Sequence, residues 1–405
     1  MNHSSENFKR IAAEEDLASH CLAHGPLEMS ETAMRPSSTA ESQDQRSASS
    51  GLRPITVSIV VPMKNEERYI GKCLDTILAN DFPMDQCEIL VMDGRSTDRS
   101  RMIVEEKATQ YPMIRLLDNP EGIAPTAMNL GIRAAKGQFI LRMDGHSEYP
   151  LNYIRTCLEE LQRTGADNVG GRWITKPGSD SLVARAIALM TQHPVGVGNA
   201  AYRIGLGDRF VDTVPLGAFR KSLFEKIGYY REDLVRNQDY ELNARIRKAG
   251  GRIYLSKRID IAYYNVPDLA RLMRQAYGNG TWMAHAWLRT PGSFSLRHGA
   301  PLAFVSCLLG CLLLSSFSEF FRTLLLGMVA MYLLCVLAAS VQISLRHGVV
   351  FLVVLPVLFV SYHLCYGAAT LIGFMRYPFA RKVIEREVSP PRNESSASPA
   401  EPPSV

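Results

Sequence analysis

The sequence lacks the paired cysteines of a disulfide framework and the closely spaced ligands of a zinc site. Its eight cysteines are scattered through 405 residues, and no C-x-x-C pair occurs. Small secreted domains use dense cysteine pairs, and structural zinc sites use short, regular spacings. We therefore expect reduced cysteines that fill apolar space.

Long blocks of charge of one sign are missing as well. The 45 Lys and Arg residues nearly balance the 40 Asp and Glu residues, which gives a formal net charge of +5. Tails that bind nucleic acid carry blocks of five or six like charges or more. The composition therefore predicts no nucleic-acid partner.

Apolar runs and aromatic residues are scarce at both ends of the chain. Residues 1–53 are rich in Ser, Glu, Ala and Gln and contain no positively charged start followed by an apolar core, so no signal peptide is expected. Such a segment buries too little apolar surface to order itself, and we expect a disordered tail. The last segment, 377–405, is predicted to be basic and then disordered, because its end is rich in Pro and Ser.

Between these ends, residues 54–265 alternate short apolar runs with amphipathic segments. Strands are expected at 55–63, 87–94, 114–119 and 138–145, and helices at 67–80, 97–111 and 124–137. This alternation predicts an α/β domain with a mainly parallel sheet. Ligands bind beyond the carboxyl ends of the strands in such sheets, where "VVPMKNEE", "LVMDGRSTD" and "LRMDGH" place polar residues. Three such strand ends predict a cleft.

Three apolar runs begin at about residue 300 and predict a transmembrane region over 300–376. They are "PLAFVSCLLGCLLLSSF", "TLLLGMVAMYLLCVLAASVQISL" and "GVVFLVVLPVLFVSYHLCYGAATLIGF". About 20 apolar residues cross a bilayer as a helix, and the first run is the shortest of the three. The preceding segment, 266–299, has the pattern of an amphipathic helix at a membrane interface.

Basic residues flank all three runs and constrain their topology. Arg297 precedes the first run, Arg346 separates the second from the third, and Arg376 follows the third. The positive-inside rule places all three positions in the cytosol, which three full spans cannot satisfy. A hairpin of the first two runs satisfies the rule, and the third is then expected to be re-entrant or a tight double pass. We expect a multi-pass protein of the inner (cytoplasmic) membrane with a cytosolic α/β domain.

Five motifs follow one another between residues 55 and 265. They are "SIVVPMKNEERYIGKCLDTIL", "LVMDGRSTDRS", "NPEGIAPTAMNLGIRAAKG", "LRMDGH" and "VDTVPLGAFRKSLFEKIGYYREDLVRNQDYELNARIRKAGGRIYL". In this order they resemble the inverting family 2 glycosyltransferases. The D-G-H and N-Q-D variants and the hydrophobic C-terminal segments resemble the succinoglycan-type subgroup, which acts in exopolysaccharide assembly. The resemblance implies the GT-A fold, with a Rossmann-like mixed sheet, and a nucleotide-sugar donor.

The resemblance places the nucleotide at the first two strand ends. Pro62, Asn65 and Glu66 fall where the family contacts the nucleotide, and an acid such as Glu66 can hold the ribose hydroxyls. Asp93 falls where the family's acid accepts a hydrogen bond from the nucleobase. An ordinary alternative is that Asp93 only opens the turn that follows it.

Asp144 and His146 fall where the family carries its D-x-D metal motif. The resemblance implies that Asp144 contacts Mg²⁺ or Mn²⁺ held by the nucleotide diphosphate, whose negative charge the cation neutralises. Imidazole suits Mn²⁺ better than Mg²⁺. His146 is therefore either a metal ligand or a hydrogen-bond partner of a phosphate.

Asp239, within "RNQDYEL", falls where the family carries its catalytic base. Inverting transfer is a single displacement at the anomeric carbon, so the acceptor hydroxyl loses a proton as it attacks, and a carboxylate can take that proton. Glu241 is the nearest substitute for this base. The ordinary alternative for Asp239 is that it caps the helix that follows.

The Q-x-x-R-W motif of processive relatives is missing, because Gln275 is followed by Ala276, Tyr277 and Gly278. Its absence favours transfer of a single sugar. The resemblance names UDP-glucose as the first candidate donor and leaves GDP- and dTDP-sugars open. The hydrophobic segments favour a polyprenyl-diphosphate-linked glycan acceptor at the bilayer. A processive polysaccharide synthase and a catalytically silent scaffold are the alternatives.

Overall fold

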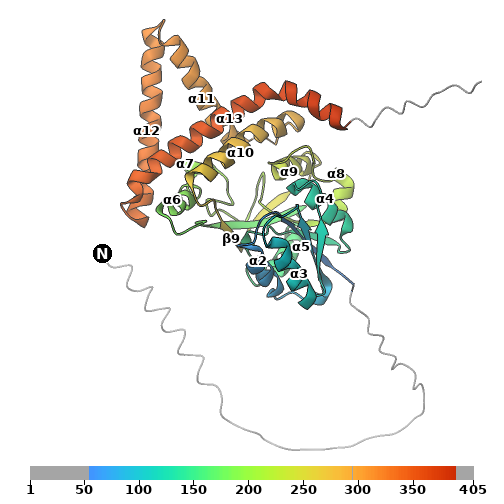
Figure 1. Cartoon of the computed structure of the whole chain (residues 1–405). Coiled ribbons are helices and arrows are strands. Elements are labelled where there is room, and N and C mark those ends of the chain that lie inside the picture. Colours follow the sequence, from blue (N-terminus) through green and yellow to red (C-terminus); the bar gives the residue numbers. More distant parts are fainter. Residues whose placement is uncertain (1–53, 294, 389–405) are drawn as a thin grey trace, which may run out of the picture. The chain divides into compact units, whose positions relative to one another are not determined.

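The computed structural model describes residues 54–293 and 295–388 (Figure 1). The expected tails at 1–53 and from residue 389 lie outside the described residues. Within the described part, all four strands and all three helices expected at the start of the α/β domain are present. They are β1 (Val57–Met63), α2 (Ile70–Leu78), β2 (Cys87–Asp93), α3 (Ser100–Gln110), β3 (Ile114–Asp118), α4 (Ala124–Ala134) and β4 (Phe139–Arg142).

The second half of the domain adds strands of both directions to the same sheet. Its elements are β5 (Ser147–Glu148), α5 (Tyr153–Thr164), β6 (Asn168–Lys176), α6 (Leu182–Met190), α7 (Pro194–Val197), β7 (Arg209–Phe210), β8 (Ala218–Arg220), α8 (Ser222–Ile227), α9 (Gln238–Lys248) and β9 (Ile253–Tyr264). The strand order is β3-β2-β1-β4-β8-β6-β9-β5, and β7 pairs with β9. Strands β1 to β4 pair in parallel, whereas β8 is antiparallel to both β4 and β6. The sheet is therefore mixed, as the GT-A prediction requires.

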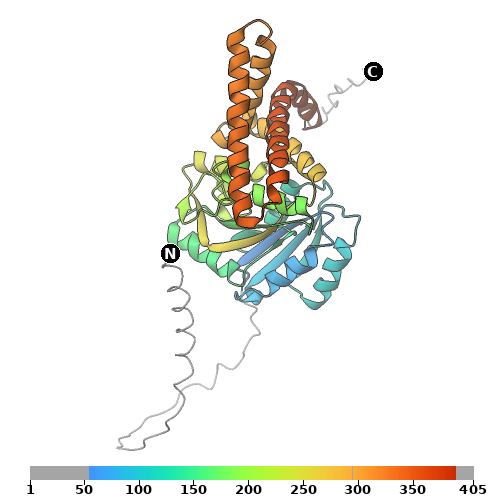
Figure 2. The same cartoon turned by 90° about the vertical axis from the view of Figure 1, so that its left-hand side faces the viewer.

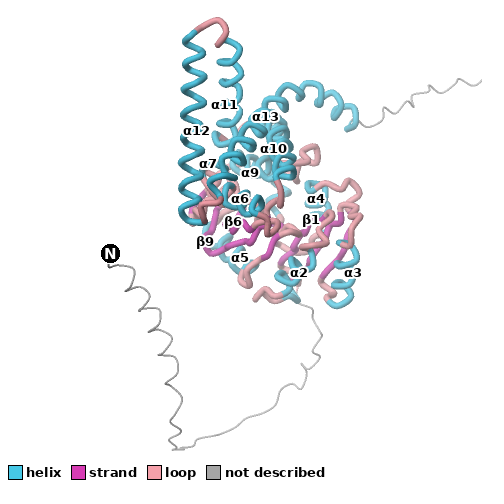
Figure 3. Tube along the Cα trace, turned by 60° about the vertical axis from the view of Figure 1, so that its left-hand side comes forward, coloured by secondary structure: helices cyan, strands magenta, loops and turns pink. Residues whose placement is uncertain are grey.

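Helices cover both faces of this sheet. Alternate residues of β1 point to opposite faces, so Ile59 and Val61 join one core cluster and Val60 joins the other. The first cluster receives apolar side chains from α2, α3 and α5, and the second from α4, α8 and α9. Burial on both faces explains why these strands are near-continuous apolar runs. Figure 3 shows the strands gathered in one sheet and the later helices outside it.

Four long helices follow the sheet. They are α10 (Leu269–Arg289), α11 (Leu296–Leu314), α12 (Glu319–His347) and α13 (Phe351–Val388). The last three contain segments long and apolar enough to cross a membrane, at Arg297–Leu314, Glu319–His347 and Phe351–Arg376. Figures 1 and 2 show α11 and α12 as an antiparallel hairpin that points away from the sheet. The predicted hairpin is therefore present as a helical arrangement.

The third apolar run differs from its prediction. It forms one continuous helix, α13, which passes through Pro356 and extends to Val388, whereas its segment apolar enough to cross a membrane ends at Arg376, the predicted end of the membrane region. A double pass or a re-entrant loop needs a turn within the run, and this helix contains none.

Close packing joins α13 to α10. A Cβ atom at Gly280 would lie 2.6 Å from the carbonyl oxygen of Tyr366, and one at Gly373 would lie 2.6 Å from that of Thr281. Small residues at these positions let the two helix backbones approach. A third core cluster also joins α6 of the sheet domain to α12 and α13. The apolar helices and the sheet domain therefore share buried contacts.

Candidate functional site

A cavity of about 210 Å³ opens at the carboxyl ends of β1, β2 and β4. Four of the predicted site residues line it: Pro62, Glu66, Asp144 and His146. The three polar strand ends identified in the sequence therefore meet at one site, as the position of ligands in α/β sheets requires.

Two glycines shape one wall of this cavity. A Cβ atom at Gly94 would lie 3.2 Å from both Gly122 Cα and the carbonyl oxygen of Met63. Gly122 has a φ of +67°, and a Cβ atom there would lie 2.9 Å from Lys64 Nζ. The Lys64 ammonium donates a hydrogen bond to the Gly122 carbonyl at 3.3 Å. Close backbone approach thus holds a lysine beside the cavity, where it can neutralise phosphate charge.

Arg142 is the central charged residue of the site, and the sequence analysis missed it. It is the last residue of β4 and is 5% exposed. Its Nε donates to Asp144 Oδ1 at 2.8 Å, and its Nη1 donates to Asp239 Oδ1. One buried guanidinium therefore joins the predicted metal-binding acid to the predicted catalytic base. A charged residue inside the apolar strand "FILR" was the available signal, because a buried charge needs a partner.

Asp239 lies in the first turn of α9, and its carboxylate faces Arg142 rather than capping the helix. The N-cap residue is Asn237, which has a φ of +61°. Burial raises the pKa of Asp239; Arg142 lowers it, and the nearby Asp144 raises it again. A carboxylate with a raised pKa is a stronger base than an exposed one. Asp239 therefore does not cap α9, and the capping alternative is wrong.

The pKa of Asp144 is shifted in the opposite direction. Burial opposes its ionisation, but Arg142 and His146 outweigh that effect and lower its pKa. Burial raises the pKa of Glu66, which faces the same cavity; His146 lowers it and Asp144 raises it. The two carboxyl groups therefore have different ionisation tendencies within one site.

The residues around His146 suit a cation that is held partly by the substrate. His146 Nδ1 is buried and has no hydrogen-bond partner, and its ring packs edge-on against Tyr263 at 5.4 Å. Among the described residues, no three His, Cys, Asp or Glu side chains gather closely enough to hold a metal ion alone. Asp144 and His146 would therefore supply only part of a coordination shell, and a diphosphate would supply the rest.

Asp93 and Asn65 lie beside the cavity and hold its loops together. Asp93 Oδ1 accepts a hydrogen bond from the Ser96 amide at 3.1 Å, and its Oδ2 lies 3.2 Å from Arg101 Nη1. Asn65 Oδ1 accepts from the Thr97 amide at 2.8 Å. Both carboxylate oxygens of Asp93 thus have protein partners. This agrees with the alternative interpretation, in which Asp93 only opens the turn that follows it.

Glu241 does not line this cavity and is fully buried elsewhere. Its carboxylate accepts hydrogen bonds from Arg245 at 2.8 and 2.9 Å and from Thr290 Oγ1 at 2.8 Å. These partners tie α9 to the residue that follows α10. Glu241 is therefore a structural ion-pair residue in this conformation and a poor substitute for the base.

Glu241→Ala should lower the midpoint of thermal unfolding by about 6 to 12 °C, because breaking a buried ion pair costs about 3 kcal/mol. Thermal unfolding of the full chain in detergent measures the change. Glu225→Ala, at an exposed position on α8, is the matched control and should leave the midpoint within about 1 °C. An unchanged midpoint for Glu241→Ala would contradict the structural role.

The mixed sheet, with its cavity at the strand ends, defines the GT-A class of fold. The model of the family described as glycosyl transferase family 2 matches residues 58–228. The succinoglycan biosynthesis protein ExoA of Rhizobium meliloti (strain 1021) is 30% identical over 257 residues, which is 63% of this chain and 77% of that protein. This chain belongs to glycosyl transferase family 2, and it is a glycosyltransferase.

Two further proteins resemble the chain. The dolichyl N-acetyl-alpha-D-glucosaminyl phosphate 3-beta-D-2,3-diacetamido-2,3-dideoxy-beta-D-glucuronosyltransferase of Methanococcus voltae is 25% identical over 315 residues, covering 76% of this chain and 93% of that protein. The solved structure of the mannosyltransferase PcManGT from Pyrobaculum calidifontis, in complex with GDP-Man and Mn²⁺, has a TM-score of 0.50 at 18% identity. The match covers 78% of this chain and 87% of the PcManGT chain, and it supports the fold assignment.

Proposed function

We propose that the protein transfers a single sugar from a nucleotide sugar to a lipid-linked glycan during exopolysaccharide assembly, with inversion at the anomeric carbon. The observation that carries the proposal is the chain of charges from Asp144 through Arg142 to Asp239. This chain of charges supports Asp239 as the proposed base, because Arg142 joins it to a cavity that Lys64, Asp144 and His146 line. UDP-glucose is the first donor to test, and the acceptor is a polyprenyl-diphosphate-linked glycan.

In this mechanism Asp239 takes the proton of the acceptor hydroxyl as its oxygen attacks the anomeric carbon. The bond from that carbon to the nucleotide diphosphate breaks, and the diphosphate leaves with the electron pair. Lys64 lies where it offsets the charge of the leaving group. Asp144 and His146 would hold a divalent cation, which supplies charge neutralisation when bound. In this proposal Glu66 contacts the ribose, and Asp93 would contact the nucleobase only by giving up one of its protein partners, Ser96 or Arg101.

Relatives and apolar helices support the lipid-linked acceptor. ExoA is named for succinoglycan biosynthesis, and the Methanococcus voltae enzyme is named for a dolichyl phosphate-linked acceptor. Three helices of this chain are long and apolar enough to cross a membrane. Membrane attachment would hold the strand-end cavity close to a lipid substrate in the cytoplasmic membrane, with the catalytic domain in the cytosol.

Membranes that carry the protein, supplied with labelled nucleotide sugars, Mg²⁺ or Mn²⁺, and a bacterial lipid extract, test the proposal. One donor should label the organic-solvent phase, and membranes without the protein should not. Label that enters only water-soluble acceptors would contradict the lipid-linked acceptor. Equal labelling in both membrane preparations would contradict the proposed activity.

His146→Asp should change the preferred cation. Imidazole suits Mn²⁺, whereas a carboxylate suits Mg²⁺, so the ratio of the transfer rate with Mg²⁺ to that with Mn²⁺ should rise about tenfold. His193→Asp, at a histidine outside this cavity, is the control and should leave the ratio unchanged. A constant ratio in His146→Asp would remove His146 as a metal ligand.

A further inference from the structure

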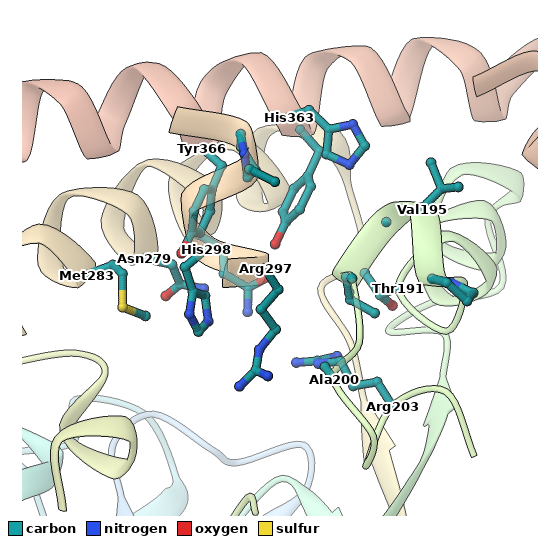
Figure 4. Close-up of a pocket in the computed structure, with 18 of the residues that line it drawn as sticks. Thr191, Val195, Ala200, Arg203, Asn279, Met283, Arg297, His298, His363 and Tyr366 are labelled. Atoms are coloured by element: carbon teal, nitrogen blue, oxygen red, sulfur yellow. The ribbon is translucent and has the colours of Figure 1, made fainter. Parts of the chain in front are cut away.

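A second cavity, of about 440 Å³, lies between the catalytic domain and the apolar helices. Its lining comes from the segment around α7 and the start of α9 on the domain side, and from α10, α11, α12 and α13 on the helix side. Figure 4 shows labelled residues from both sides around this space. None of the site residues predicted from the sequence lines this second cavity.

Two arginines converge on this cavity (Figure 4). The Arg297 side chain is 5% exposed, and its Nε is buried without a hydrogen-bond partner. Its Nη2 donates to Asp212 Oδ2 at 2.7 Å and its Nη1 donates to Asn199 Oδ1 at 3.4 Å, so Asp212 is its one carboxylate partner among the described residues. Arg203 packs over the Trp173 ring at 4.4 Å, and its neighbours among the described residues are aromatic rings rather than carboxylates. Two cations thus line one cavity, and among the described residues their only ion pair is that of Arg297 with Asp212.

An uncompensated buried charge is costly unless an anion joins it. Guanidinium groups present several donors in a fixed plane, which matches the oxygens of a phosphate. Tyr202 and Tyr240 line the same cavity, and their hydroxyls lie 3.2 Å apart. The polar end of the cavity is therefore built for a phosphate or diphosphate group.

An apolar groove along the α11–α12 hairpin adjoins the cavity. Phe304 and Tyr332 line both the cavity and this groove, which has a volume of about 650 Å³. The other residues of the groove are nearly all apolar: Phe320, Thr323, Leu324, Gly327, Met328 and Met331. A ligand with an anionic head and a long hydrocarbon tail fits both parts, whereas a free phosphate fits only the first.

The second cavity also lies beside the segment of α9 that carries Asp239. Asn237 and Tyr240 line it, and they flank Asp239 on α9. Arg142, which lines the first cavity, contacts the Asp239 carboxylate. Asp239 is thus linked to the first cavity through Arg142 and to the second through its neighbours on the chain, as the proposed single displacement between a donor and an acceptor needs.

We propose that this second cavity is the acceptor site, in which Arg203 and Arg297 bind the phosphate or diphosphate of a lipid whose tail lies in the groove along α11 and α12. The inference rests on the proposed lipid acceptor and adds the location and residues of its binding site.

The test uses the full chain in detergent with UDP in excess, so that the first cavity is filled, and measures the affinity for three probes. The probes are farnesyl diphosphate, farnesol and inorganic pyrophosphate. Farnesyl diphosphate should bind at least about tenfold more tightly than either of the others. Equal binding of pyrophosphate and farnesyl diphosphate would overturn the lipid source and leave only an anion site.

Arg203→Gln and Arg297→Gln should each weaken farnesyl diphosphate binding by about tenfold or more and leave farnesol binding unchanged. Arg297→Lys keeps the charge and the contact to Asp212, and it should bind more tightly than Arg297→Gln. Arg172→Gln, which removes an equivalent ion pair to Asp260 outside both cavities, should bind like wild type. Unchanged binding in Arg203→Gln and Arg297→Gln would overturn the inference.

Sugar transfer measured on the same preparations separates this inference from the proposed function. Transfer to lipid by wild type, with unchanged farnesyl diphosphate binding in both glutamine variants, overturns the acceptor site alone. Arginine-dependent binding of farnesyl diphosphate without transfer from any donor overturns the proposed function alone.

Discussion

Asp239→Asn should lower kcat for sugar transfer by about 1000-fold, because an amide cannot take the proton of the acceptor hydroxyl. Asparagine preserves the shape of the side chain, and Arg142 keeps its second partner, Asp144, at 2.8 Å. Nucleotide binding should therefore change little. Initial rates at saturating donor, together with a direct nucleotide-binding measurement, separate loss of the base from loss of the fold.

The matched control for this prediction is Asp233→Asn. Asp233 precedes α9 in the same segment and also pairs with an arginine, Arg231, at 2.9 Å. Its replacement should leave kcat within about threefold of wild type. If Asp239→Asn and Asp233→Asn transfer sugar equally well, Asp239 is not the base, and the buried, fully paired Glu241 offers no ready replacement.

Arg142→Gln should move the acidic limb of the pH profile of kcat/KM to higher pH. Arg142 lowers the pKa of both Asp144 and Asp239, so its loss raises both. The base works only when it is ionised, and a higher pKa leaves a smaller ionised fraction at a given pH. Activity should therefore fall more at pH 6 than at pH 8.

Arg142→Lys provides the control for the charge. A lysine restores one positive charge without the two-armed geometry, so the acidic limb should return most of the way to its wild-type position. A merely structural role of Arg142 predicts lower activity at every pH with an unmoved limb. That result would contradict the electrostatic link between the two aspartates.

The start of the catalytic domain was predictable because its signals are local. Apolar runs of strand length and helical spacing located β1 to β4 and the helices between them, and the order of motifs brought Asp144 and Glu66 to one cavity. The predicted strand ends therefore coincide with the observed site. The role of each residue there stays a prediction.

The links between these residues were not predictable from the sequence, because they join distant positions. Arg142 and Asp239 are 97 residues apart, and Glu241 meets Thr290 across 49 residues. Local patterns carry no information about such contacts. For the same reason, the sequence did not single out Arg203 and used Arg297 only as a basic flank of the first apolar run, although both line the second cavity.

The third apolar run shows a different limit. The basic flanks suggested a turn within this run, yet α13 is one helix that continues through Pro356. A proline is tolerated inside an apolar helix because neighbouring helices supply partners for the backbone groups that it leaves without a hydrogen bond. The contacts of α13 with α10, α11 and α12 depend on the folded arrangement, so the sequence pattern alone predicted the wrong local structure.

The mass of the lipid product tests the central claim most directly. Purified full-length protein is incubated with the accepted nucleotide sugar and a lipid-linked glycan, and the extracted lipid is measured by mass spectrometry. The account predicts one new species, heavier than the acceptor by a single sugar residue. A ladder of products from one acceptor would identify a processive synthase, and an unchanged lipid with sugar on soluble acceptors only would contradict the lipid-linked acceptor.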